Sequence, residues 1–229
     1  MSWKYSLTFL MLATTCVFAG AVAWEVVHWP ALPFLYVALS FALLSLAYAG
    51  VGPRLLLKRA SGRRSAWGWL LFGPYFLLTG MAFHLYRVLS LELAFAQVMP
   101  NLFFGRRLTF QEARRLKWVG VLDLACEFEE IGLLRDSSGY RSLPVLDGTS
   151  PTEQQMRSVV GWLEEAVPSG PVFVHCALGH GRSACVVIAY LLSVGLVASA
   201  AEGEGLLRSL RRGVWLNATQ RQQLRKFES

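Results

Sequence analysis

The sequence predicts an α/β domain with a central mixed sheet flanked by helices, preceded by an all-helical membrane region of two or three hydrophobic segments. Hydrophobic residues make up 54% of the 229 residues, and nearly all of the excess lies before about residue 97. Beyond that point, short apolar stretches alternate with helical periodicity and turn signals, which is typical of an α/β domain. We therefore divide the chain into a membrane region, 1–96, and a second domain, 97–229.

The first two hydrophobic segments predict a helical hairpin in a membrane. Residues 5–24 and 31–51 carry no charged side chain, and roughly 20 helical residues cross a hydrocarbon core of about 30 Å. A signal peptide is the alternative for the first segment, because Lys4 precedes an apolar core and residues 21–23 resemble a cleavage site. The length of this segment and the second segment that follows at once favour the hairpin.

Basic residues predict the orientation of this hairpin. Between residues 52 and 65 lie five Lys or Arg residues and no acid, whereas the linker 25–30 contains neither Lys nor Arg. Short loops rich in Lys and Arg remain in the cytoplasm. We therefore expect both ends of the hairpin to face the cytoplasm.

The third hydrophobic segment, 67–86, decides on which side of the membrane the second domain lies. If it spans, the second domain emerges outside the cytoplasm, and if it is re-entrant or lies along the surface, the domain stays inside. Gly73-Pro74 interrupts the segment, and its aromatic ends suit an interfacial helix as well as a span. We expect an integral membrane protein with a cytoplasmic second domain, and keep the extracytoplasmic orientation as the alternative.

Charge and cysteine spacing exclude several classes of function. The net charge is +7, which favours anionic partners such as phosphates or acidic lipids. No zinc-finger spacing, recognition helix or aromatic-studded basic motif accompanies this charge, so we expect no nucleic-acid partner. The four cysteines form no CxxC pair and have no histidine at ligand spacing, which predicts neither a metal, nor another cofactor, nor a disulfide scaffold.

Five segments of the second domain have clear secondary-structure signals. Ser150-Pro151-Thr152-Glu153 has the form of a capping box with proline at the first helical position, and predicts a firm helix start. The expected elements are strands at 119–124, 144–146 and 172–174 and helices at 151–167 and 182–194.

The most specific pattern is VFVHCALGHGRS, residues 172–183, in which a strand leads into a glycine-bearing loop and the loop into a helix. Backbone N–H groups of such a loop can turn inward and bind an anion, and the helix end adds partial positive charge. A thiol at this place beside an arginine, Cys176, is expected to be available as the thiolate. The residues expected to bind phosphate are Ala177, Leu178, Gly179, His180, Gly181 and Arg182.

Two neighbours of the loop complete the expected chemistry. Arg182 can bind two phosphoryl oxygens with its planar fork, which lysine cannot do. The Ser183 hydroxyl can donate a hydrogen bond to the sulfur and help it to leave in a second step.

The segment HCALGHGRS is similar to the HCxxGxxR[ST] loop of protein tyrosine and dual-specificity phosphatases. The resemblance extends to residues 98–105, 120–124 and 216–220, which resemble the opening strand, the next core strand and the turn before the last helix of these domains. It implies metal-independent hydrolysis of a phosphomonoester through a phosphocysteine intermediate, with Cys176 as nucleophile and Arg182 as phosphate clamp.

The same family uses an aspartic acid on a separate loop, about 30 residues upstream, to protonate the leaving oxygen. Asp147 lies 29 residues before Cys176, after an expected strand, so it fits this role, with a turn residue in Asp-Gly as the alternative. Asp123, inside a strand, and Asp136, in a polar turn, fit less well.

Several points remain open at this stage. The family includes enzymes for phosphoproteins and for phospholipids, and membrane attachment makes a phospholipid substrate plausible. A phosphate-binding pseudophosphatase or membrane scaffold without turnover is the alternative function. Cys126 is either a small buried residue or a redox partner of Cys176, and the acidic run Glu127, Glu129 and Glu130 is either a solvated turn or part of the cleft entrance.

Overall fold

The computed structural model describes residues 2–27, 31–115 and 117–228 and divides into two compact units. The first unit comprises residues 1–59 and 64–88, and the second comprises residues 60–63 and 89–229. Residues 28–30 of the predicted hairpin linker lie outside the described residues.

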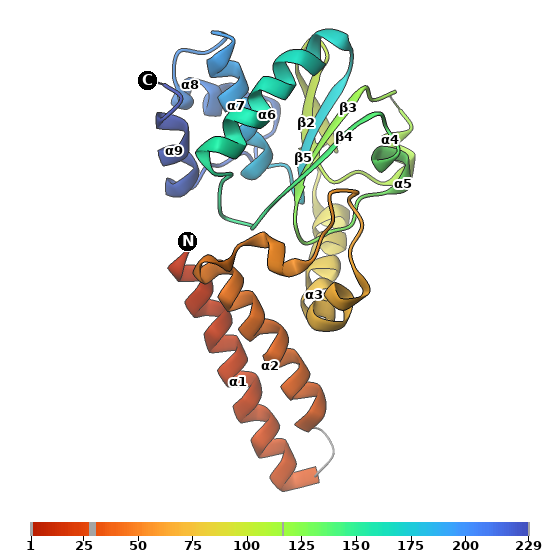
Figure 1. Cartoon of the computed structure of the whole chain (residues 1–229), viewed down its shortest axis with the longest axis vertical. Helices are drawn as coiled ribbons and strands as arrows, with labels where there is room; N and C mark the ends of the chain where they lie inside the picture. Colours follow the sequence, from red (N-terminus) through yellow and green to blue (C-terminus); the bar gives the residue numbers. More distant parts are fainter. Residues whose placement is uncertain (1, 28–30, 116, 229) are drawn as a thin grey trace. The chain divides into compact units, whose positions relative to one another are not determined.

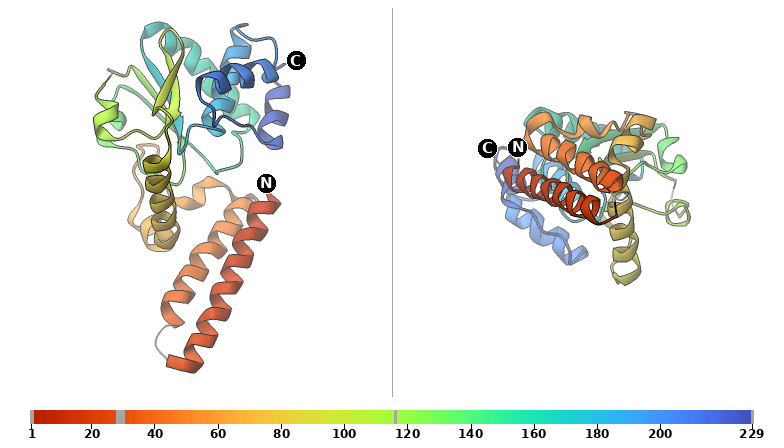
Figure 2. Two further views of the ribbon diagram at one scale, coloured as in Figure 1. Left: turned by 180° about the vertical axis from the view of Figure 1, so that it is seen from behind. Right: turned by 90° about the horizontal axis from the view of Figure 1, so that it is seen from below.

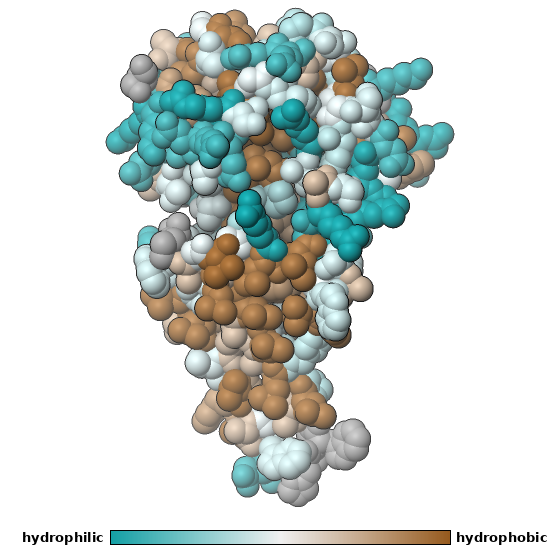
Figure 3. Space-filling model, in the orientation of Figure 1, coloured by the Kyte–Doolittle hydropathy of each residue, from teal (hydrophilic) through white to brown (hydrophobic). Residues whose placement is uncertain are grey.

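The first unit is all-helical, as expected. Three of the helical segments among the described residues are long and apolar enough to cross a membrane, and this indicates association with a membrane. Figure 3 shows hydrophobic side chains over much of the helical hairpin. The elements of this unit are α1 (Trp3–Val27), α2 (Ala31–Leu46), η1 (Ala47–Val51), η2 (Pro53–Leu56) and α3 (Ala66–Leu89).

Helices α1 and α2 lie side by side as the predicted hairpin (Figures 1 and 2). Near one end, the hydroxyls of Ser6 and Ser45 lie 3.1 Å apart, and near the other a Cβ on Gly20 would lie 3.0 Å from the Cβ of Phe34. Small residues and interhelical hydroxyl bonds are the contacts that hold helices together in lipid, where no hydrophobic force drives them together. The exposed outer side chains include Met11 and Phe18, which are 68% and 71% exposed.

The expected break in the third hydrophobic segment is wrong, because α3 runs continuously through Pro74. A proline cannot donate to the carbonyl four residues earlier, which here is that of Leu70. The hydroxyl of Tyr36 on α2 donates to this carbonyl at 2.6 Å instead. Gly73 leaves room for this contact, since a Cβ there would lie 2.8 Å from the Tyr36 oxygen.

The second unit is built on a mixed five-stranded sheet with the order β1-β2-β5-β3-β4, which confirms the predicted fold class. Only the β1–β2 pair is antiparallel; the other neighbours are parallel. Its strands are β1 (Phe95–Met99), β2 (Leu102–Arg106), β3 (Gly120–Ala125), β4 (Gly139–Val145) and β5 (Val172–Cys176). Its helices are α4 (Phe110–Ala113), α5 (Gly132–Arg135), α6 (Glu153–Ala166), η3 (Val167–Ser169), α7 (Arg182–Ser193), α8 (Ala200–Leu210) and α9 (Ala218–Arg225).

Helices cover both faces of this sheet, with α6 to α9 on one side and α4 and α5 on the other (Figures 1 and 2). Alternate residues of a strand point to opposite faces. Leu122 and Val174 accordingly pack in the larger core with α6 and α7, whereas Val121 and Phe173 pack in the smaller core on the opposite face. The central strands are therefore apolar on both sides, and all residues of β3 and β5 are buried.

Two local expectations need correction. Residues 98–105 do not form one strand, because Pro100-Asn101 turns the chain between β1 and β2, with Asn101 in the left-handed region at φ 65°. The helix α6 is capped by Thr152 and not by Ser150. The Thr152 side chain accepts a hydrogen bond from the Gln155 N–H, and the Gln155 side chain accepts one from the Thr152 N–H. The Gln155 side chain, rather than Glu153, closes the capping box.

Candidate active site

The predicted phosphate loop joins the central strand β5 to the buried helix α7. The carboxyl end of a central parallel strand is where open α/β sheets place their ligand sites. Gly179 adopts φ +78°, and a Cβ there would collide with the backbone of Gly105 on β2, so only glycine fits. The Arg107 N–H donates to the Ala177 carbonyl at 3.0 Å and ties the loop to the end of β2.

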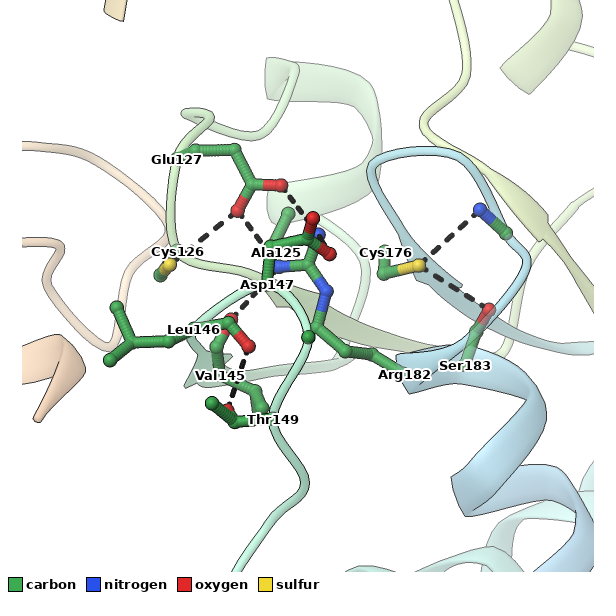
Figure 4. A network of polar contacts seen from close by, with 12 residues as sticks. Ala125, Cys126, Glu127, Val145, Leu146, Asp147, Thr149, Cys176, Arg182 and Ser183 are labelled. Atoms are coloured by element: carbon green, nitrogen blue, oxygen red, sulfur yellow. Dashed lines mark hydrogen bonds and ion pairs between the residues drawn. The ribbon is translucent and has the colours of Figure 1, made fainter. Parts of the chain in front are cut away.

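The loop surrounds the sulfur of Cys176 with donors. The thiol is buried, with the residue 3% exposed. The Ser183 hydroxyl lies 3.6 Å from Sγ (Figure 4). The Gly179 N–H donates to Sγ at 3.3 Å. Both the backbone N–H and the hydroxyl are groups that can donate a hydrogen bond to sulfur.

Arg182 begins α7 and is fully enclosed by partners. Its Nη1 and Nη2 donate to the two carboxylate oxygens of Glu127 at 2.8 and 2.5 Å, and Nη1 also donates to the Val145 carbonyl at 2.9 Å (Figure 4). Burial disfavours the guanidinium charge, but Glu127 and then Asp147 outweigh burial and raise the pKa of Arg182. Among the described residues, the buried Nε of Arg182 has no hydrogen-bond partner.

Glu127 belongs to the acidic run for which the sequence left two alternatives, a solvated turn or part of the cleft entrance. The solvated-turn interpretation of the acidic run is wrong for Glu127 and Glu130, which are 6% and 3% exposed. Burial alone would raise the pKa of Glu127, but the charge and hydrogen bonds of Arg182 hold it below its usual value. A buried arginine requires a carboxylate partner, and this requirement was the one signal that could have found Glu127.

Asp147 lies on the loop after β4, and its side chain is 67% exposed. One carboxylate oxygen is 3.1 Å from Nη2 of Arg182 (Figure 4). The loop is anchored at the start of α9, where Asn217 donates to the Gly148 carbonyl at 2.8 Å and Gln220 donates to the Thr149 carbonyl at 3.0 Å. The structure thus brings an exposed carboxylate close to Arg182.

A second polar cluster lies beneath the loop. Oxygen or nitrogen atoms of Asp123, Glu130 and His175 lie within 4.8 Å of one another, and all three residues are buried. His175 Nε2 is 2.9 Å from Glu130, and the Tyr140 hydroxyl donates to Asp123 at 2.8 Å. Burial, followed by the charge of Asp123, raises the pKa of Tyr140. These contacts join His175 to Glu130 and Asp123 to Tyr140 in the interior of the second unit.

The other cysteines, all among the described residues, form no disulfide. Cys126 is buried and contacts Glu127, with Sγ 3.5 Å from Oε2. Burial raises the pKa of Cys185 to about 12, so this thiol is not a nucleophile at neutral pH.

The second unit is similar to known phosphatases. Residues 121–229 match the family described as dual specificity phosphatase, catalytic domain. Human dual specificity protein phosphatase 2 is 29% identical over 109 residues, and this similarity covers 42% of our chain and 32% of the human protein. The chain therefore spans about a third of the length of this relative.

Solved structures share the fold of the second unit. Tk-PTP in its active form has a TM-score of 0.53 at 25% identity, covering 59% of this chain and 96% of its own. PTPMT1 has a TM-score of 0.52 at 22% identity, covering 58% and 93%. Human DUSP28 has a TM-score of 0.53 at 22% identity, covering 61% and 95%.

The part of the chain that matches the family contains Asp147, Cys176, Arg182 and Ser183. The strand–loop–helix around Cys176 and the mixed sheet both lie in the unit that shares the solved folds. Residues 121–229 therefore resemble the catalytic domain of dual-specificity phosphatases, and the second unit shares its fold with the solved phosphatase structures.

Proposed function

We propose that the second unit hydrolyses phosphomonoesters through a phosphocysteine intermediate and needs no metal. The observation that carries this proposal is the environment of Cys176, whose sulfur lies 3.3 Å from the Gly179 nitrogen and 3.6 Å from the Ser183 hydroxyl. Arg182, fixed by the buried Glu127, supplies the cation at the rim of the same loop.

In the first step, the Cys176 thiolate attacks phosphorus and forms the S–P bond. The P–O bond to the leaving group breaks, and Asp147 gives its proton to the departing oxygen. The loop N–H groups and the Arg182 guanidinium bind the phosphoryl oxygens and stabilise the charge that they carry in the transition state.

In the second step, water attacks phosphorus of the phosphocysteine. Asp147, now a carboxylate, takes a proton from this water, and the S–P bond breaks to release inorganic phosphate. The electron pair returns to sulfur, where the hydrogen bond from Ser183 stabilises the departing thiolate.

The substrate in this proposal is a phosphomonoester at a membrane surface. The three apolar helices of the first unit support this, because attachment concentrates the catalytic unit near its target. A phospholipid monoester and a membrane-bound phosphoprotein both meet this description. PTPMT1, which shares the fold, has been solved in complex with PI(5)P.

The test uses the full chain in nanodiscs with excess chelator. We expect hydrolysis of an aryl phosphate, and panels of phospholipid monoesters and phosphopeptides then identify the substrate class. Binding of tungstate without hydrolysis of any phosphomonoester would instead identify a pseudophosphatase or scaffold.

We further propose that the second unit faces the cytoplasm. The basic residues between 52 and 65 support a cytoplasmic start of α3, and the need of a thiolate for a reducing compartment supports a catalytic unit on the same side. It requires that α3 lie in the membrane without crossing it. Paired reporters fused after Leu102 test this: signal from a reporter active only outside the cytoplasm would establish three spans and refute the proposal.

A further inference from the structure

Glu92 lies between α3 and β1, outside the residues that match the family, and contacts the phosphate loop. We infer that Glu92 is a positioning residue that holds the loop in the shape that binds an oxyanion, through His180 and Arg211. This inference rests on the proposed function and names an additional determinant of the same site.

Two chain segments meet at the outer side of the loop. One carboxylate oxygen of Glu92 is 2.7 Å from His180 Nε2 and 3.0 Å from Arg211 Nη2. The other accepts from the Gly213 N–H at 2.6 Å. Arg211 in turn donates to the Leu178 carbonyl of the loop at 3.2 Å, and also to the carbonyl beside Glu92. Glu92 therefore contacts His180 of the loop directly, and it contacts Leu178 of the loop through Arg211, in the segment after α8.

These contacts direct the His180 side chain toward Glu92. Its ring is engaged by Glu92, so His180 contributes to the loop through its backbone, whose carbonyl accepts from the Trp215 N–H at 3.4 Å. Gly213 is required beside it, because a Cβ there would collide with the His180 ring and lie 2.8 Å from Glu92.

The charges of this cluster are mutually compensated. The Arg211 side chain is 1% exposed, and a buried cation without a carboxylate is strongly unfavourable. Burial would raise the pKa of Glu92, but the hydrogen bond from His180 and then that from Gly213 lower it below the usual value. Glu92 is thus an anion that contacts His180 of the loop and Arg211, which itself contacts the loop.

The two possible roles of Glu92, positioning and simple electrostatics, predict opposite changes in the affinity for an anion when Glu92 is removed. If Glu92 acts only as a negative charge near the loop, its removal would strengthen the binding of an anion. If it holds the loop in shape, its removal weakens this binding. The Glu92→Gln variant separates the two, because glutamine has nearly the same shape and no charge.

The test measures tungstate binding by calorimetry to the full chain in detergent micelles, in a Cys176→Ser background where no turnover occurs. We expect Glu92→Gln to weaken binding about tenfold, within the range of coupling between residues in contact. Glu165→Gln, the same chemical change at an exposed position near the carboxyl end of α6, is the matched control and leaves binding unchanged.

Gly213→Ala is the second variant and decides the matter if Glu92→Gln does not fold. It displaces His180 and Glu92 while keeping every charge, and its backbone is not in the left-handed region. Weakened binding in the folded variants, with unchanged unfolding temperature, supports the inference. Unchanged or tighter binding overturns it while the proposed function stands, whereas absence of binding by the parent protein defeats both.

Discussion

The two units of this chain are stabilised by different interactions. The hairpin of the first unit relies on close helix contact and on hydroxyl bonds such as Ser6–Ser45, and residues 1–88 contain a single carboxylate, that of Glu25. The second unit buries apolar strands on both faces and encloses ion pairs such as Arg182–Glu127. Substitutions of charged residues in these ion pairs should therefore affect the second unit and leave the hairpin unchanged.

The largest difference between the two units is expected in turnover when a cysteine of each is replaced by serine. Cys176→Ser should reduce turnover to background, because the thiolate is lost, while the loop N–H groups and Arg182 still bind tungstate. Cys16→Ser in α1 is the control from the first unit and should retain full activity. Steady-state hydrolysis of an aryl phosphate measures both, and wild-type turnover by Cys176→Ser would exclude the phosphocysteine mechanism.

Asp147→Asn should lower the rate roughly 10²- to 10⁴-fold, the usual contribution of a general acid. The loss should shrink for leaving groups of low pKa, which need no proton. Rates measured over a series of aryl phosphates give this dependence, and Asp136→Asn serves as control. An equal loss for every leaving group would mean that Asp147 maintains the loop rather than donating a proton.

Arg182→Lys should lower the rate about 10²- to 10³-fold, as for the loss of one donor to a transition-state oxyanion. An ammonium group cannot form the two parallel bonds that Glu127 accepts from the guanidinium at 2.5 and 2.8 Å. Arg157→Lys on the exposed face of α6 is the matched change. Similar kcat values for the two variants would contradict the role of Arg182.

Acid should destabilise the second unit and spare the first. The pKa of Glu127 lies below its ordinary value of 4.5 in the folded protein, so its contribution to stability is complete above about pH 4.5 and is lost as the pH falls through the folded pKa. Hydrogen exchange measured peptide by peptide at decreasing pH follows the two units separately.

The variant Glu127→Gln sharpens this prediction. It should be less stable than wild type at neutral pH, because Arg182 loses its buried partner, and should lose less further stability on acidification. An identical acid response of both proteins would show that other carboxylates, such as Glu112 beside Arg106, cause the transition.

The smallest effect is expected at the start of α6. Thr152→Ala removes the acceptor for the Gln155 N–H and should lower the free energy of unfolding of the second unit by about 1 kcal/mol. Urea denaturation monitored by near-UV circular dichroism measures the change. Ser150→Ala should have a smaller effect, since Ser150 is not the cap.

Local patterns predicted more of the catalytic loop than of its support. Cys176, Arg182 and Ser183 lie within eight residues, and the apolar strand before them, the glycines between them and the apolar helix after them together indicated their chemistry. The strand β5 and the helix α7 formed where these apolar runs stand. Glu127 reaches Arg182 across 55 residues and Glu92 reaches His180 across 88, and no local pattern encodes such contacts.

In the first unit, the third hydrophobic helix also depends on a contact that local patterns could not predict. Gly73-Pro74 signals a break by local rules, yet α3 continues because Tyr36, on another helix, binds the carbonyl that proline leaves without its donor. A local prediction cannot include a donor supplied from 34 residues away.

The position of Glu92 also bears on how the catalytic unit should be isolated. A soluble fragment begun at Gln97, where the hydrophobic composition ends, would lack both Glu92 and the Leu93 carbonyl, the two acceptors from this segment for Arg211. It would also begin inside β1, which starts at Phe95. A fragment that starts directly after α3, at Ser90, retains the strand and both acceptors, and is the shorter protein to choose for crystallisation and inhibitor screening.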